Sequence, residues 1–86
     1  MIPQGYRPCF LIRPHVHPDG SRVVNLCWVT ELNYPQHYQT FRSWQEALEA
    51  GRREASRSGR PLFQAQSEYG GDELLVLDPL AEKRGA

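Results

Sequence analysis

Two short runs rich in apolar and β-branched residues, 9–12 and 22–29, predict a β-hairpin near the start of the chain. Between them lies His17-Pro18-Asp19-Gly20-Ser21. Proline fixes φ at the first turn position, aspartate tolerates the second, and glycine accepts positive φ, so this segment predicts a tight turn.

The hydrophobic pattern selects the register of this hairpin. A two-residue Asp-Gly loop would leave apolar and polar residues mixed on both faces. A three-residue loop with Gly20 as a bulge instead pairs Phe10 with Trp28 and Ile12 with Leu26. We predict the three-residue loop, because it gives one clean apolar face.

In this register both faces of the hairpin carry apolar side chains. The first face holds Phe10, Ile12, Val16, Val24, Leu26 and Trp28. The second face holds Cys9, Leu11, Arg13, His15, His17, Val23, Asn25, Cys27 and Val29. One helix can cover only one face, so the second needs another cover, either the segment Leu74 to Leu80 or a second subunit. We expect a second subunit to cover part of it.

The middle of the chain predicts a turn, a strand and a helix. Residues 31–36 contain Asn-Tyr-Pro and indicate a turn, and the alternation over 37–41 indicates a third strand. Ser43-Trp44-Gln45-Glu46 matches a capping box at a helix start. The residues at helical spacing that should face inward are Trp44, Ala47, Leu48, Gly51 and Ala55. Gly59 and Pro61 should end the helix.

Two further strands are expected after the helix, over 62–69 and 73–77, joined by a turn at Gly70-Gly71. Asp78-Pro79 resembles a helix cap, so a short helix over Leu80 to Lys83 is expected before a frayed tail. The fold class is therefore α+β, with elements in the order β-β-β-α-β-β. We predict an antiparallel sheet of four to five strands with one helix packed on one face, in a single domain whose ordered core spans about residues 6–80.

Composition narrows the class of protein. The 86 residues are 40% hydrophobic and 23% charged, which is typical of a globular chain. No apolar run is long enough to span a membrane, and no secretory leader is evident, so a cytoplasmic location is expected. The net charge is zero, which disfavours a dedicated nucleic-acid binder. The charge is uneven, however, because residues 1–60 sum to +3 and residues 61–86 to −3.

Side chains able to do chemistry are sparse. His15 and His17 share a strand face, but no third ligand stands at metal-binding spacing, so polar hairpin residues are the favoured interpretation. Cys9 and Cys27 are diagonal neighbours in the predicted register, which is poor geometry for a disulfide. No serine lies in a nucleophile motif, and no glycine-rich loop fits phosphate. We therefore expect no catalytic residues, no metal and no cofactor.

The sequence leaves two hypotheses for function. The first is a non-catalytic interaction module that binds another protein or forms a homodimer. The second is a nucleic-acid-binding module that uses the exposed hairpin residues Arg13, His15, His17, Arg22 and Asn25. A possible basic patch consists of Arg52, Arg53, Arg57 and Arg60, where part of the clustering complements the helix dipole.

Overall fold

The computed structural model of the chain describes residues 2, 4–67 and 70–77, and describes side chains at residues 2 and 5–65. The elements are η1 (Gln4–Tyr6), β1 (Cys9–Val16), β2 (Arg22–Val29), β3 (Pro35–Phe41), α1 (Trp44–Ser58), β4 (Leu62–Ser67) and β5 (Gly70–Leu77). The predicted order β-β-β-α-β-β is confirmed. The expected terminal helix over Leu80 to Lys83 lies outside the described residues.

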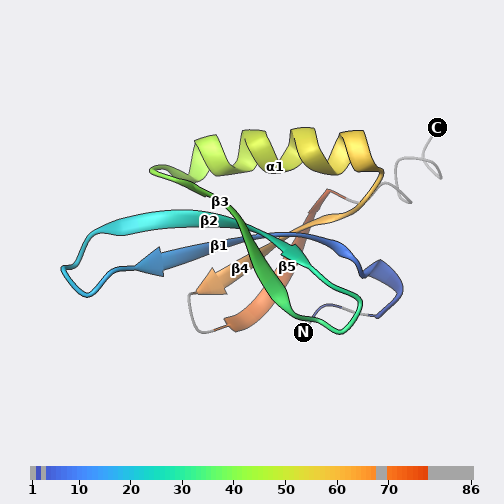
Figure 1. Cartoon of the computed structure of the whole chain (residues 1–86), viewed down its shortest axis with the longest axis horizontal. Coiled ribbons are helices and arrows are strands. Elements are labelled where there is room, and N and C mark those ends of the chain that lie inside the picture. Colours follow the sequence, from blue (N-terminus) through green and yellow to red (C-terminus); the bar gives the residue numbers. More distant parts are fainter. Residues whose placement is uncertain (1, 3, 68–69, 78–86) are drawn as a thin grey trace.

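The five strands form one sheet in the order β3-β2-β1-β4-β5, and α1 lies across one face (Figure 1). The prediction of a wholly antiparallel sheet is wrong, because β4 pairs with β1 in parallel. The cause is α1, which acts as a crossover connection between β3 and β4. A crossover helix returns the chain to the end of the sheet where the previous strand began, so β4 runs in the direction of β3 and of β1.

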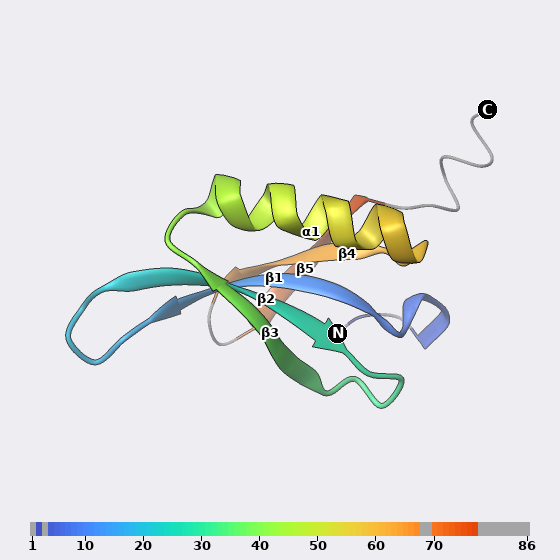
Figure 2. The ribbon, with the colours of Figure 1, turned by 45° about the horizontal axis from the view of Figure 1, so that its top comes forward.

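The predicted hairpin register is confirmed. Phe10 faces Trp28 and Ile12 faces Leu26, with the aromatic ring centroids of the first pair 4.9 Å apart. The Gly20 amide donates to the His17 carbonyl at 2.9 Å, and Gly20 has φ +90°. The turn is thus the three-residue loop that the apolar pattern requires. In both ribbon views its tip projects beyond the end of α1 (Figure 2).

Helix α1 begins and ends as the sequence predicts. The amide of Glu46 donates to the Ser43 hydroxyl at 3.2 Å, and Gly59 closes the helix in the left-handed conformation. The second bond of the capping box, from the Glu46 side chain to the Ser43 amide, is not formed between these two described residues. Ser43 therefore caps the helix alone.

The inward stripe of α1 is made of small residues, so the helix lies close to the sheet. Ala47, Gly51 and Ala55 are buried. A Cβ atom at Gly51 would lie 3.0 Å from Leu62 Cδ1 and 3.3 Å from Ile12 Cδ1. Glycine at this position permits the close approach.

The second face of the sheet has its own apolar core within the chain. Leu11, Cys27 and Val29 are at most 3% exposed, although the sequence predicted that this face would need an added cover. Ile2 and Tyr6 pack there, together with Phe63 and Ala65 of β4. Sequence patterns predicted no element before residue 9, so this N-terminal contribution was missed. The alternative cover, Leu74 to Leu80, falls where side chains are not described.

The last two strands differ in one detail from the prediction. Ser67 pairs with Gly70, so the connection lies between these residues, and Gly70 and Gly71 belong to β5. The expected Gly-Gly turn is therefore wrong, because glycine is used here inside a strand. Among the described residues, no helix is long and apolar enough to cross a membrane.

Candidate binding surfaces

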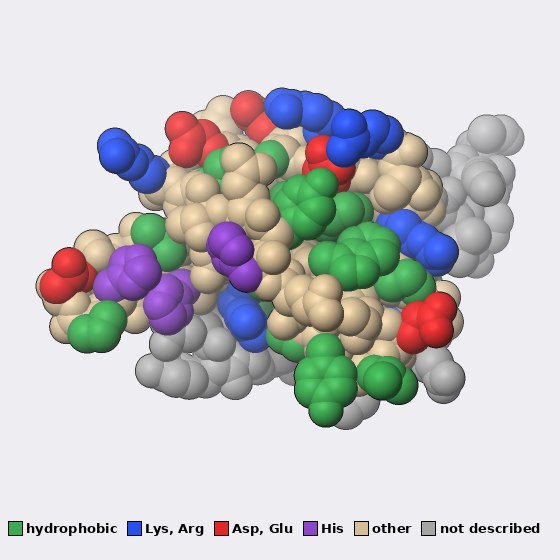
Figure 3. Space-filling view, viewed as in Figure 1, with side chains coloured by type: hydrophobic (Ala, Val, Ile, Leu, Met, Phe, Trp, Pro, Cys, Tyr) green, Lys and Arg blue, Asp and Glu red, His purple; other side chains and the backbone are tan. Residues whose placement is uncertain are grey.

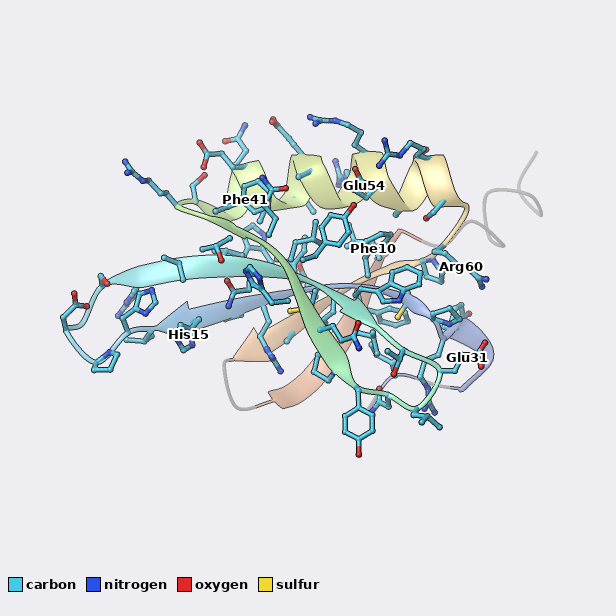
Figure 4. The ribbon with its side chains drawn as sticks, in the orientation of Figure 1. Phe10, His15, Glu31, Phe41, Glu54 and Arg60 are labelled. Carbon is cyan, nitrogen blue, oxygen red and sulfur yellow. The ribbon has the colours of Figure 1, made fainter. Side chains whose placement is uncertain are left out.

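The hairpin residues singled out from the sequence do not form one surface. Arg13, His15 and His17 lie on the face opposite α1, and the rings of His15 and His17 meet edge to face with centroids 4.9 Å apart. Figure 4 shows His15 on the projecting part of β1. Arg22 pairs with Val16 and therefore projects from the other face.

Asn25 is engaged in a hydrogen-bond row across the sheet. The Thr40 hydroxyl donates to Asn25 Oδ1 at 2.8 Å, and His37 Nε2 lies 2.7 Å from the same hydroxyl oxygen. This row links β2 to β3 on the face that carries Arg13. It gives Asn25 a structural partner on the neighbouring strand.

The turn at the hairpin tip is held by an aspartate. The amide and hydroxyl of Ser21 both donate to Asp19 Oδ1, at 2.9 and 2.7 Å. These bonds hold the pKa of the Asp19 carboxyl below its ordinary value, and the bond from the Ser21 hydroxyl has the larger effect. The carboxylate thus stabilises the turn.

Cys9 and Cys27 are both buried. Burial raises the pKa of the Cys27 thiol, and the nearby charge of Arg13 opposes that rise. A buried thiol with a raised pKa is a poor nucleophile. Among the described residues, no group of three or more His, Cys, Asp or Glu side chains could hold a metal ion.

The predicted basic patch, which lies on α1 and just beyond its end, is exposed but mixed in charge. Arg52, Arg53, Arg57 and Arg60 all face solvent. Arg57 forms an ion pair with Glu54, which raises the pKa of the arginine. Glu46 and Glu49 are exposed on the first half of the same helix. Figure 3 accordingly shows blue and red side chains together along the helix.

A different surface, missed by the sequence reasoning, lies at the end of the sheet away from the hairpin tip. A shallow groove of about 490 Å³ is formed there by Pro8, Trp28, Thr30, Glu31, Leu32, Tyr34 and Gln36. We call it the β2–β3 groove. Leu32 is 79% exposed and Tyr34 is 67% exposed, the two highest values among the large hydrophobic residues described. Figure 3 shows hydrophobic side chains gathered on this side of the molecule.

The loop that forms one wall of the β2–β3 groove has a fixed conformation. The Thr30 amide donates to the Tyr34 carbonyl at 3.0 Å, and the Tyr34 amide donates to Thr30 Oγ1 at 3.2 Å. Asn33 has φ +66°, which asparagine tolerates better than most residues. This turn leaves Leu32 and Tyr34 directed into solvent. The only sequence signal was two large apolar residues inside a predicted turn.

Among the described residues that line the β2–β3 groove, Glu31 is the charged one. The Arg7 guanidinium donates to the backbone carbonyl of Glu31 at 3.0 Å and so anchors the loop through the main chain. Figure 4 places Glu31 at the opposite end of the sheet from His15. The groove thus combines aromatic and apolar walls with one acidic group.

Comparison of the chain with protein-family models, with curated proteins and with solved structures gave no match. The fold and its surfaces are therefore the basis for any functional conclusion.

Proposed function

We propose that this protein is a non-catalytic interaction module that binds another polypeptide chain through the β2–β3 groove. The observation that carries the proposal is the exposure of Leu32 and Tyr34 beside Trp28 in one groove. Exposed apolar side chains gathered in one place are typical of protein-binding surfaces. Tyrosine and tryptophan in particular contribute large contact areas at low entropic cost.

The rest of the molecule supports this choice of surface. Both faces of the sheet bury their own apolar clusters within the chain, one beneath α1 and one against Ile2 and Tyr6. Among the side chains that the structure describes, four large hydrophobic residues are exposed, and the two most exposed, Leu32 and Tyr34, both line the groove, whereas Val16 and Tyr38 lie elsewhere. A partner that covered Leu32 and Tyr34 would remove apolar area from water without disturbing either core.

Site-specific crosslinking tests this proposal. A photoreactive phenylalanine analogue is placed at Tyr34, and a matched control carries it at Gln45 on the exposed side of α1. In cells that express the protein, we expect polypeptide adducts at position 34 and few at position 45. Equal labelling at both positions, or no polypeptide adduct at position 34, contradicts the proposal. An adduct of twice the chain mass identifies the partner as a second copy.

The hairpin face remains the second candidate, as a nucleic-acid-binding surface. It is favoured by the side-by-side placement of Arg13, His15 and His17 on a projecting arm. Phosphate contacts make affinity fall steeply as salt increases. Binding to a single-stranded oligonucleotide that weakens with salt, and that is lost in Arg13→Gln but not in Arg53→Gln, would support this function.

A further inference from the structure

We propose that the occupant of the β2–β3 groove is a proline-rich segment in the polyproline II conformation, with a lysine or arginine at one end. This inference rests on the proposed function, because it names the class of partner for the same surface. The walls of the groove and their hydrogen-bonding groups carry the argument.

The walls match the apolar surface of such a segment. Trp28 and Tyr34 are flat aromatic residues, and Pro8 and Leu32 complete the apolar lining. Trp28 is held edge to face against Phe10, so its ring is already positioned before a ligand arrives. Aromatic-lined grooves are suited to the ridges of a polyproline II helix.

The hydrogen-bonding groups of the groove also match those of a polyproline II segment. Trp28 brings an indole N–H, which is a donor only, and Gln36 brings an amide that can donate. Thr30 already accepts from the Tyr34 amide. A polyproline II segment has no internal hydrogen bonds, so its carbonyls are free to accept. Its prolines have no N–H and need no acceptor from the groove.

The charge of the groove gives the segment a direction. Glu31 is an exposed residue of the groove lining, and the Arg7 guanidinium donates to its backbone carbonyl, a bond that does not use the Glu31 carboxylate. A cationic residue at the end of the ligand nearest Glu31 would pair with this carboxylate, whereas an acidic residue would be repelled. The complementary ligand therefore carries arginine or lysine at that end.

The main rival occupant is an extended strand added to β3. This strand is at an edge of the sheet, and edge strands can pair with another chain. A β-bulge between Leu26 and Cys27 interrupts its pairing with β2. Tyr38 lies at this irregularity, and its ring meets Phe10 at 5.6 Å while its hydroxyl donates to Glu54 at 3.3 Å. An irregular edge is a poorer template for strand addition, which favours the polyproline II mode.

Tryptophan fluorescence provides the test. In a Trp44→Phe background, Trp28 is the remaining tryptophan and reports directly on the groove. Three aromatic-free peptides are titrated into the full chain: a proline-rich peptide with a terminal arginine, the same peptide with glutamate in place of arginine, and a valine-threonine peptide with the same arginine. We expect saturable binding of the first peptide, with the second weaker by about threefold and the third weaker by about tenfold.

Variants then locate the binding. Tyr34→Ala and Leu32→Ser should each weaken the first peptide by about tenfold, Glu31→Gln by about threefold, and the helix-surface control Glu49→Gln should leave it unchanged. Absence of binding, equal binding of the valine-threonine peptide, or insensitivity to both Tyr34→Ala and Leu32→Ser would overturn the inference. In any of those cases, polypeptide crosslinks at position 34 would leave the proposed function standing.

Discussion

At the scale of single residues, the stability of α1 depends on one side-chain oxygen. The Ser43 hydroxyl accepts from the Glu46 amide, and no reciprocal bond shares this task. We expect Ser43→Ala to lower the free energy of unfolding by about 1 kcal/mol. Urea denaturation measures the change. The matched variant Ser56→Ala, on the exposed side of the helix, should change it by less than about half as much. Equal effects would mean that Ser43 is not the cap.

The backbone conformation at position 20 requires glycine, because a φ of +90° is unfavourable for other residues. Space is not the reason, since a Cβ there would meet nothing within 4 Å. We expect Gly20→Val to lower the free energy of unfolding by about 2 kcal/mol. Gly20→Asn should cost less, because asparagine enters this region more readily. Thermal unfolding of the two variants distinguishes conformational strain from a steric clash.

Asp19 gives the hairpin a dependence on pH. Its folded-state pKa lies below the ordinary value because Ser21 donates twice to the carboxylate. The contribution to stability is therefore present above the unfolded-state pKa and is lost as pH falls through the lowered folded-state pKa. Ser21→Ala should raise the Asp19 pKa, as measured by NMR titration of the carboxyl carbon. An unchanged pKa would show that the serine hydroxyl is not its main cause.

At the scale of elements, α1 approaches the sheet where Gly51 faces Leu62 and Ile12, which are both fully buried. We expect Gly51→Val to lower the free energy of unfolding by about 2 kcal/mol, because the added atoms overpack a site whose nearest neighbours are fully buried side chains. Ser56→Val, exposed on the same helix, should cost less than about 0.5 kcal/mol. Similar losses in the two variants, measured by urea denaturation, would contradict the close approach.

The elements that sequence patterns predict well are those with strong local signals. The Pro-Asp-Gly turn, the serine cap and the terminal Gly59 each impose a backbone geometry, and the structure has all three. The parallel pairing of β1 with β4 was missed because it joins residues about fifty positions apart. Nothing local in residues 62–67 specifies the neighbouring strand. The crossover connection through α1 determines that β4 lies beside β1.

At the scale of the whole molecule, the apolar core on the sheet face opposite α1 could not be predicted from the sequence alone. The exposed apolar face expected from the hairpin pattern is closed within the chain, with Ile2 contributing a fully buried side chain. A lone isoleucine near the start of the chain has no periodicity to reveal its role. The β2–β3 groove was missed for a similar reason, because it joins Pro8, Trp28 and Tyr34 from separate segments.

The central claim is that the β2–β3 groove binds a polypeptide segment. The most direct test is an NMR titration that locates the residues a peptide ligand contacts. The protein has two tryptophans, Trp28 in the groove and Trp44 at the start of α1, and each gives its own indole N–H resonance. On titration with the arginine-ended proline-rich peptide, we expect the Trp28 indole and the amides of residues 30–36 to shift in the ¹H–¹⁵N spectrum. The Trp44 indole and the amides of His15 and His17 should stay in place. Shifts confined to the hairpin tip or to α1, or no shifts, would contradict the claim that the groove binds a proline-rich segment.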